Sequence, residues 1–429
     1  MDRIRITGGV PLNGRIDIGG AKNAALPLMA ACLLTADKVT LSNLPHLADI
    51  STMANLLVHL GVSFSIDGCA EAGGHIGRVL VLDAGKVQNT VAPYEIVRKM
   101  RASVVVLGPL LARFGKAKVS LPGGCAIGTR PIDLHLKALE AMGTQITIEE
   151  GYVLAEAPKG LQGADITFPK VSVGATENLL MAAALANGTT ILRNAAREPE
   201  VSDLAECLVS MGAKIEGIGS DTLTIHGQKR LHGTDYRIIA DRIEAGTYAV
   251  AAVMTGGKLE LSGIRPDIMT STFDALKIAG AAIEEYPDHI IVSRATPNIR
   301  PFDLVTDPYP GFATDMQAQM MALATIADGT SHISETIFEN RFMHVPEMLR
   351  MSAQITIDGH MAIIHGVPKL KSAEVMATDL RASVSLVLAA LTAEGTSTLN
   401  RVYHIDRGYE RVEEKLQAVG AQIERIRGS

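Results

Sequence analysis

A pattern that occurs six times is the feature of this sequence that most restricts its fold. In each copy an apolar helix of small residues precedes a turn and a strand, and about 20 residues later a second helix gives way to another strand. A spacing of about 65 to 80 residues is too long for common solenoid repeats and predicts compact α/β units. The turn-and-strand segments are residues 35–43, 114–124, 186–194, 255–263, 327–335 and 393–401. The helix-to-strand junctions are residues 59–66, 141–148, 210–218, 278–286, 350–357 and 418–426.

The length of 429 residues exceeds what one ordinary hydrophobic core supports, so we expect two domains. The first 20 residues contain predicted strands without a helix, whereas the sixth copy has no second strand. We therefore expect the N-terminal strands to complete the sixth copy. This closure predicts one domain of residues 21–239 and a second domain of residues 1–20 plus 240–429, each with three copies.

Glycine ends the second helix in five of the six copies, and Ser352 takes its place in the fifth. Glycine is the usual residue of a left-handed helix cap because it has no Cβ. The pattern predicts left-handed caps at Gly61, Gly143, Gly212, Gly280 and Gly420.

Composition and charge exclude several classes of protein. The net charge is −6, so nucleic acid is not an expected partner. The apolar runs fall short of the about 18 residues that span a bilayer, and the N-terminus lacks a signal-peptide core. Four dispersed cysteines indicate free thiols in a reducing compartment, so we expect a cytoplasmic protein. We also expect no membrane insertion, and a monomer or weak homo-oligomer. Metal-ligand spacings and Walker or Rossmann glycine patterns are absent from the sequence, so neither a metal nor an organic cofactor is expected.

Polar residues recur where the small-residue helices are predicted to begin. The N–H groups of a helix N-terminus attract anions, and the helix dipole disfavours cations there. A cation at this end therefore indicates an anionic ligand. For Arg242 and Arg381 the alternative is that they only connect neighbouring copies through ion pairs. The positions are Lys22-Asn23, Arg101, Ser172-Val173-Gly174, Asp241-Arg242, Asp315, and Asp379 with Arg381.

A second polar set follows the first strand of several copies. Residues 120–135, SLPGGCAIGTRPIDLH, place Cys125 after a Pro-Gly-Gly run and five residues before Arg130. Such a run suits a loop close to a ligand, and a nearby guanidinium favours a reactive thiolate. Taken alone, a cytosolic cysteine such as Cys125 is more often a small buried apolar residue than a reactive thiol. If the copies are equivalent, both polar sets lie at one end of each domain, and two such ends facing each other form a cationic cleft. The equivalent loops carry Arg193 and Arg197, Asn340-Arg341, and Arg407.

These segments resemble the enolpyruvyl transferases over essentially the whole chain. The resemblance implies two domains, each an inside-out α/β barrel of three βαβαββ-like units with pseudo-threefold symmetry. The loop LPGGC resembles the branch of the family that uses a UDP-sugar, because the shikimate branch lacks this cysteine. The matching segments are GAKNAALP (20–27), MRAS (100–103), LPGGC (121–125), RPIDLH (130–135), KVSVGAT (170–176), NAAREPE (194–200), DRIEAGT (241–247), TDMQAQ (314–319), ENRFMHVPE (339–347), ATDLRAS (377–383) and HIDRGYER (404–411).

The resemblance implies transfer of the enolpyruvyl group of phosphoenolpyruvate to the 3′-hydroxyl of UDP-N-acetylglucosamine with release of phosphate. This reaction is the first committed step of peptidoglycan synthesis, which serves the cell wall, cell shape and cell division, and it is the target of fosfomycin. The implied phosphoenolpyruvate-binding residues are Lys22, Asn23, Arg130, Arg341, Arg381 and Arg407. The implied UDP-N-acetylglucosamine-binding residues are Asn23, Arg101, Arg130, Pro131, Ile132, Asp133, Leu134, Lys170, Val171, Ser172, Val173, Asp315 and Ile337.

The resemblance also implies catalytic roles. The implied catalytic residues are Cys125, Asp315, Lys22, Arg407 and Asp379. Cys125 corresponds to the general acid, and Asp315, at a helix start, is the candidate base for the sugar hydroxyl. Two alternatives remain: a shikimate-type enolpyruvyl transferase on the same fold, and an inactive relative that only binds UDP-sugars. A binding protein needs no loop thiol, so the presence of Cys125 weighs against the second alternative.

Overall fold

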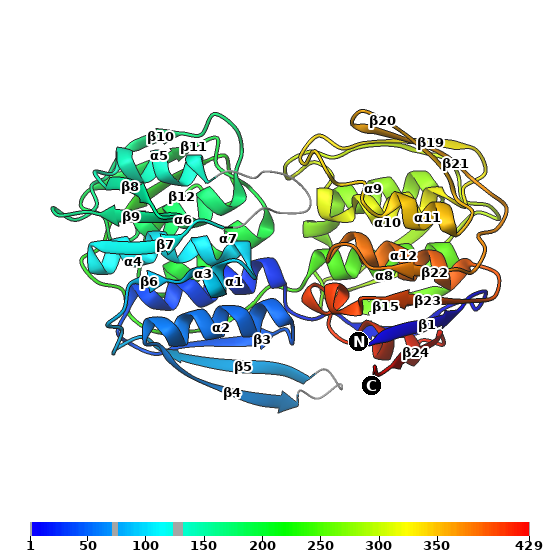
Figure 1. Cartoon of the computed structure of the whole chain (residues 1–429), viewed down its shortest axis with the longest axis horizontal. Helices are drawn as coiled ribbons and strands as arrows, with labels where there is room; N and C mark the ends of the chain where they lie inside the picture. Colours follow the sequence, from blue (N-terminus) through cyan, green and yellow to red (C-terminus); the bar gives the residue numbers. More distant parts are fainter. Residues whose placement is uncertain (1, 71–75, 123–131, 429) are drawn as a thin grey trace. The chain divides into compact units, whose positions relative to one another are not determined.

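The computed structural model of the chain describes residues 2–70, 76–122 and 132–428 (Figure 1). The chain divides into two compact units. The C-terminal unit comprises Met1–Gly19 and Ala240–Ser429, and the N-terminal unit comprises Gly20–Ile239 outside the segment that is not described. Among the described residues, no helix combines the length and the apolar character needed to cross a membrane.

The N-terminal unit contains the first three copies of the repeat. The first copy consists of α1 (Lys22–Ala31), η1 (Cys32–Leu34), β3 (Val39–Leu44), α2 (Ala48–Leu60), β4 (Ser63–Ala70) and β5 (Ile76–Asp83). The second consists of β6 (Val91–Ala92), α3 (Tyr94–Val97), η2 (Arg101–Val106), α4 (Leu107–Phe114), β7 (Lys116–Ser120), α5 (Asp133–Ala141), β8 (Gln145–Glu149) and β9 (Tyr152–Glu156). The third consists of β10 (Asp165–Thr167), α6 (Val173–Ala183), β11 (Thr189–Arg193), α7 (Pro199–Ser210), β12 (Lys214–Glu216), β13 (Thr222–His226) and β14 (Thr234–Arg237).

The C-terminal unit contains the other three copies and the two N-terminal strands. These strands are β1 (Arg3–Thr7) and β2 (Asn13–Asp17). The fourth copy consists of α8 (Arg242–Thr255), β15 (Lys258–Ser262), η3 (Pro266–Met269), α9 (Thr270–Ala279), β16 (Ala281–Glu285) and β17 (His289–Arg294). The fifth consists of β18 (Asp303–Val305), η4 (Thr314–Met316), α10 (Gln317–Ala324), β19 (Thr330–Ser334), α11 (Val345–Arg350), β20 (Gln354–Asp358) and β21 (Met361–His365). The sixth consists of β22 (Glu374–Met376), α12 (Ala382–Thr392), β23 (Thr396–Asn400), η5 (Val402–Arg407), α13 (Val412–Ala418) and β24 (Gln422–Ile426).

The described strands form six four-stranded sheets, one for each copy, and all six have the same order. An edge strand pairs in parallel with the first strand of the copy, and two antiparallel strands follow it, as in β14-β3-β5-β4. The edge strand β14 comes from the end of the N-terminal unit and pairs with β3 at its beginning. This parallel pairing closes the three sheets of that unit into a ring.

The N-terminal strands close the other unit, although only one of them does so as predicted. Strand β1 lies between β23 and β24 and completes the sixth copy, as expected. The same prediction for β2 was wrong, because β2 pairs in parallel with β15 of the fourth copy, with Asn13 opposite Lys258. The fourth copy needs a parallel edge strand, and β14, which precedes it in the chain, is already paired in the other unit.

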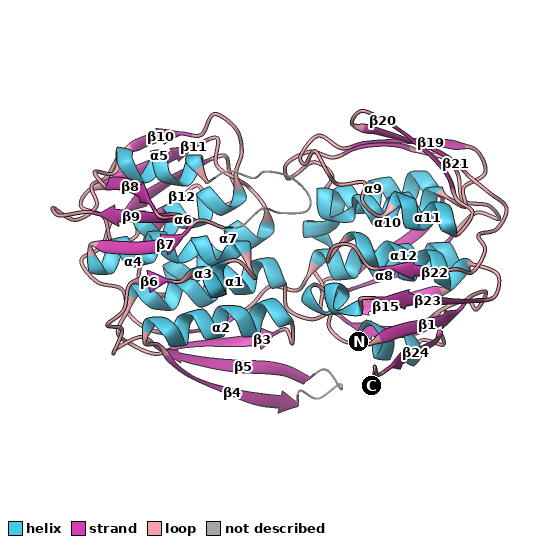
Figure 2. Cartoon of the chain, in the orientation of Figure 1, coloured by secondary structure: helices cyan, strands magenta, loops and turns pink. Residues whose placement is uncertain are grey.

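The small-residue helices form the interior of each unit, and the sheets lie outside them (Figure 2). Every residue of α8 and α12 except the last is buried, which explains why these helices have little amphipathic pattern. Small residues allow the helices to approach closely: a Cβ on Gly108 of α4 would lie 2.3 Å from the carbonyl oxygen of Asn178 in α6. This arrangement is the inside-out α/β barrel that the resemblance to the enolpyruvyl transferases implied.

The left-handed caps are confirmed at all five predicted glycines, whose φ angles lie between 88° and 104°. Ser352 adopts the same conformation with φ of 66°. A left-handed residue with a Cβ costs about 1–2 kcal/mol relative to the right-handed conformation.

We expect Ser352→Gly to raise the free energy of unfolding by about 0.5–1 kcal/mol, because the relief of this strain exceeds the extra chain entropy of glycine. Gly420→Ala is the matched control, since a Cβ there would have no heavy atom within 4 Å and only the backbone strain would change. We expect it to lower stability by about 1 kcal/mol in a denaturant titration. A Ser352→Gly variant no more stable than its parent would contradict the strain argument.

Candidate functional site

The polar positions singled out in the sequence lie at the starts of the interior helices. Lys22 begins α1, Arg101 begins η2, and Ser172 is the N-cap of α6, where its Oγ accepts from the N–H of Ala175 at 3.3 Å. In the other unit, Asp241 is the N-cap of α8, Asp315 lies in η4 before α10, and Arg381 precedes α12.

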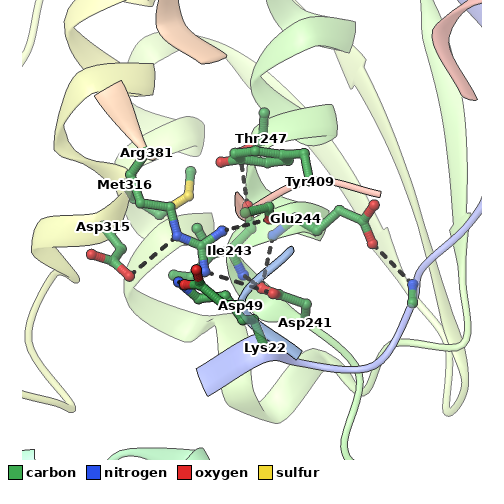
Figure 3. A network of polar contacts seen from close by, with 12 residues as sticks. Lys22, Asp49, Asp241, Ile243, Glu244, Thr247, Asp315, Met316, Arg381 and Tyr409 are labelled. Atoms are coloured by element: carbon green, nitrogen blue, oxygen red, sulfur yellow. Dashed lines mark hydrogen bonds and ion pairs between the residues drawn. The ribbon is translucent and has the colours of Figure 1, made fainter. Parts of the chain in front are cut away.

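Arg381 joins three of these helix starts in the C-terminal unit (Figure 3). Its guanidinium lies 3.4 Å from the Oδ2 of Asp315 and 3.7 Å from the Oδ2 of Asp241, and it donates to the carbonyl of Gly408 at 3.2 Å. Only 2% of Arg381 is exposed. Burial works to lower the pKa of Arg381, but Asp241, Tyr409 and Asp315 outweigh it and the pKa is raised. Arg381 therefore forms the ion pairs between neighbouring copies that the alternative explanation of this residue expected.

Asp315 is held by two guanidinium groups. The Nη2 of Arg341 donates to its Oδ1 at 2.7 Å, and Arg381 lies beside its Oδ2. Arg341 is 4% exposed, whereas about a quarter of the Asp315 side chain is exposed. The carboxylate is thus oriented by buried cations and open to a ligand on another side. Two cations this close favour its ionised form.

A neutral network supports the same helix start. The hydroxyls of Tyr409 and Thr247 lie 2.9 Å apart, and the Nε2 of Gln319 contacts both at 3.1 Å. Gln319 also donates to the carbonyl of Asp315 at 2.9 Å. The ring of Tyr409 lies 5.4 Å from the guanidinium of Arg381. These buried contacts fix both Asp315 and its cationic partner.

Asp379 uses one carboxylate oxygen for structure. Its Oδ1 accepts from the N–H groups of Arg381 and Ala382 at 2.8 and 2.9 Å, which caps α12. Its Oδ2 is buried without a hydrogen-bond partner among the described residues. His344 is fully buried nearby, and burial lowers its pKa to about 4. Asp379 is half-buried as a residue, and its buried Oδ2 keeps an unused acceptor.

In the N-terminal unit, Lys22 is 6% exposed and its ammonium lies 3.2 Å from the Oδ2 of Asp49 in α2. A buried cation of this kind is expensive unless it is paired, so Asp49 stabilises the charge of Lys22 where α1 begins. Figure 3 labels both residues. Asp49 was not singled out in the sequence.

Asn178 connects segments of this unit that carry residues predicted to bind the sugar nucleotide. Its Nδ2 donates to the carbonyl of Val104 at 3.0 Å and to the Nδ1 of His135 at 2.9 Å, and its Oδ1 accepts from the N–H of Gly108 at 2.6 Å. Burial and the charge of Arg101 lower the pKa of His135 to about 4, although Asp133 opposes them. His135 is therefore neutral at pH 7 and accepts at Nδ1.

The remaining predicted site residues lie in different environments. Ile132 and Leu134 are buried, each 7% exposed. Lys170 is exposed, Val171 and Val173 are half-buried, and Asp133 begins α5. Ile337 and Arg407 are half-buried, the latter at the end of η5. Cys125, Arg130 and Pro131 lie outside the described residues. The described thiols Cys32 and Cys207 are buried, and burial raises the pKa of Cys207 to about 12.

Several residues that organise the site were missed by sequence reasoning. Asn178 lies within α6, Glu335 follows β19 and Tyr409 follows η5, and a partner distant in sequence gives each of them a role. The one available signal was chemical, since buried polar residues inside apolar helices require hydrogen-bond partners.

Comparison with known proteins identifies the family of the chain. A family model for EPSP synthase (3-phosphoshikimate 1-carboxyvinyltransferase) matches residues 6–416. The UDP-N-acetylglucosamine 1-carboxyvinyltransferase of Paramagnetospirillum magneticum is 64% identical over 100% of this chain and 99% of its own length. The chain belongs to the UDP-N-acetylglucosamine 1-carboxyvinyltransferase family. A member from Rhodospirillum centenum is 60% identical over 100% of this chain and 99% of its own.

Solved structures confirm the fold of this carboxyvinyltransferase family member. The enolpyruvyl transferase NikO from Streptomyces tendae has a TM-score of 0.89 at 26% identity, over 100% of this chain and 99% of that one. An EPSP synthase from Acinetobacter baumannii has a TM-score of 0.76 at 18% identity, over the whole of both chains. The second likeness concerns the fold alone.

The lowered pKa of His135 leads us to predict how the free energy of unfolding depends on pH. The pKa is near 6.5 in an unfolded chain and about 4 in the folded protein, so between these values the unfolded state binds more protons. The contribution of His135 is therefore complete above pH 6.5 and is lost as the pH falls toward 4, by about 3 kcal/mol at most.

We expect His135→Gln to flatten this loss in denaturant titrations between pH 7 and 4. The comparison must be with the parent, because burial raises the pKa of Asp203 to about 7 and that of Glu177 as well, and these groups titrate in the opposite sense. His59→Gln, at an exposed histidine, is the control. Parallel pH profiles for His135→Gln and the parent would refute the assignment.

Proposed function

We propose that this chain transfers the enolpyruvyl group of phosphoenolpyruvate to the 3′-hydroxyl of UDP-N-acetylglucosamine and releases phosphate. The observation that carries the proposal is Asp315, a carboxylate held between Arg341 and Arg381 at a helix start and partly open, in a chain of this family. Such a carboxylate is placed to accept a proton from a hydroxyl of a bound ligand. The product is an intermediate of peptidoglycan synthesis, and the proposed location is the cytoplasm.

The cations of both polar sets, at the helix starts and in the loops after the strands, are proposed to bind the anionic groups of both substrates. Lys22, Arg130 and Arg407 hold the phosphate and carboxylate of phosphoenolpyruvate, with Asn23, Arg341 and Arg381 assisting. The sugar nucleotide contacts Asn23, Arg101, residues 130–134, residues 170–173, Asp315 and Ile337. The half-buried N-terminus of α6, with Ser172 as its cap, suits a diphosphate because its N–H groups and dipole favour negative charge.

The chemistry is addition followed by elimination. Cys125 protonates the methylene carbon of phosphoenolpyruvate, which builds positive charge on the neighbouring carbon, while Asp315 takes the proton of the sugar hydroxyl that attacks it. The resulting tetrahedral phospho-ketal loses phosphate from that carbon and a proton from the methyl group, which restores the double bond. Asp379, with its free buried Oδ2, is the candidate for this late proton transfer. Charge neutralisation and positioning by the cations supply much of the rate.

The two compact units are proposed to be the two domains of this enzyme. The proposed domains are residues 21–239, and residues 1–20 with 240–429. We propose a monomer or weak homo-oligomer, without nucleic acid, membrane insertion or cofactor.

The decisive test is phosphate release. Purified chain mixed with phosphoenolpyruvate and UDP-N-acetylglucosamine should release inorganic phosphate in equal amount to the enolpyruvyl sugar nucleotide. Shikimate 3-phosphate in place of the sugar nucleotide should give none. Phosphate release with shikimate 3-phosphate and not with the sugar nucleotide would assign the chain to the shikimate branch of the family. Binding of the sugar nucleotide without phosphate release from either mixture would indicate a binding protein.

We expect Cys125→Ala to lower turnover at least about 100-fold, because general acid catalysis contributes roughly 10²–10⁴-fold. The matched control is Cys207→Ala, which removes a buried thiol whose pKa of about 12 leaves it unreactive. Fosfomycin should label Cys125 and leave Cys32 and Cys207 unlabelled in a mass-spectrometric digest. Full turnover by Cys125→Ala would contradict the acid role.

A further inference from the structure

Glu335 departs from the internal repeat. It is the last residue of the fifth turn-and-strand segment, and the same place in four other copies holds Asn43, Asn194, Gly263 and Arg401. Those four residues have φ angles of 58°, 53°, 82° and 58°, a left-handed conformation near the end of β3 for Asn43 and directly after the strand for the other three. Glu335 is not among the residues with positive φ in the described chain. In this copy a side-chain acceptor stands where the others have a backbone turn.

The carboxylate of Glu335 is almost completely buried, with 1% of the residue exposed. Its Oε1 accepts from the hydroxyl of Thr306 at 3.0 Å and from the N–H groups of Ile337 and Phe338 at 2.9 and 3.1 Å. Its Oε2 accepts from the hydroxyl of Thr314 at 2.9 Å. Burying a carboxylate is costly unless such donors satisfy it. Four donors on one buried group therefore indicate a specific arrangement.

The donors come from the segments that carry Asp315 and Ile337, two residues proposed to contact the sugar nucleotide. Strands β18 and β19 are parallel, so their carboxyl ends meet at one sheet edge, where Thr306 and Glu335 follow them. Thr314 immediately precedes Asp315, and Ile337 lies two residues after Glu335. Glu335 thus connects the turn of the proposed base to the loop of Ile337.

The loop of residues 335–341 has a second connection to Asp315. Arg341, at the far end of residues 335–341, donates to the Oδ1 of Asp315 at 2.7 Å. Thr306 adds a further tie, because its hydroxyl accepts from the N–H of Thr336 at 2.9 Å. The loop and the base are therefore held in one geometry from both ends.

We propose that Glu335 is a positioning residue for the sugar nucleotide, which sets the distance between the base Asp315 and the loop of Ile337. The inference rests on the proposed function. Glu335 itself touches neither substrate. Its removal should weaken sugar-nucleotide binding and proton transfer and leave phosphoenolpyruvate binding nearly unchanged.

The first experiment compares Glu335→Leu with Glu335→Gln. Leucine fills the volume but removes every acceptor, and we expect it to raise KM for UDP-N-acetylglucosamine about tenfold or more and to lower kcat, with KM for phosphoenolpyruvate within about threefold. Glutamine keeps one carbonyl oxygen for three of the donors, and its amide faces the Thr314 hydroxyl. We expect it to restore KM for the sugar nucleotide to within about threefold.

The second experiment isolates the side of the base and also serves if Glu335→Leu does not fold. Thr314→Val keeps the shape of the side chain and removes its hydrogen bond to Glu335, so kcat should fall about tenfold with little change in KM for the sugar nucleotide. The control is Thr325→Val in the same unit, a buried threonine whose hydroxyl bonds its own helix at the carbonyl of Ala322. It should keep parental kinetics.

The outcomes separate positioning from a purely structural role. Variants that lose thermal stability but keep the parental KM for UDP-N-acetylglucosamine and parental kcat per folded molecule would overturn the inference. Calorimetric titration with UDP-N-acetylglucosamine gives a readout that does not need turnover. Sugar-nucleotide binding that is equally tight in the parent and in Glu335→Leu overturns the inference alone, whereas a parent that binds none overturns it together with the proposed function.

Discussion

The burial of helix ends is the constraint on which the rest of this structure depends. Helices that form the interior of a unit bring their N-termini together away from water, where unpaired N–H groups and the positive end of the dipole need anionic partners. Asp241 and Asp379 supply them as caps, and Asp315 lies in the same place at the third helix start. Carboxylates so close require cations, and the buried guanidinium of Arg381 lies between Asp241 and Asp315. The charged character of the site is thus a consequence of the inside-out fold.

The closure of each ring fixes where the chain passes between the units. Copies that lack an edge strand take it from the other end of the unit, β14 in one case and β2 in the other. The two connections are therefore adjacent in structure: the N–H of Ala21 donates to the carbonyl of Ile239 at 2.7 Å, and that of Asp241 donates to Gly19 at 2.8 Å. Gly20 is obligatory here, because a Cβ would lie 1.9 Å from the carbonyl oxygen of Asn43. Lys22 and Asp241 follow these connections directly, so in each unit the topology fixes where a charged helix start lies.

Local chemistry explains which parts of this structure were predictable from the sequence. The repeat determined the six helix–strand copies, and glycine at the junctions determined their caps, because both depend on neighbouring residues. The pairing of β2 with β15 was not predictable, since strand partners depend on which edges remain open after the other sheets form. Lys22 and Arg381 were singled out because a cation at a helix start opposes the helix dipole, and Asp315 because it lies at the corresponding helix start of its own copy. Asp49, Asn178 and Glu335 were not, because each acts through partners far away in the chain. Ser352 shows that the fold imposes a cap where the residue is unfavourable.

The environment of Asp315 presents a chemical difficulty that the surrounding contacts help to resolve. Two guanidinium groups stabilise the carboxylate as an anion and make it a reluctant proton acceptor. For Asp315 to act as the proposed base, its effectiveness must come from geometry, because a base held in line with its proton is far more effective than one that must first be oriented. Gln319 fixes the backbone at Asp315, Arg341 fixes one carboxylate oxygen, and Glu335 ties the preceding residue to the neighbouring loop. In the proposed reaction the same cations also neutralise the phosphate and carboxylate of phosphoenolpyruvate, so a site for two anionic substrates pairs a weakened base with rigid placement of that base.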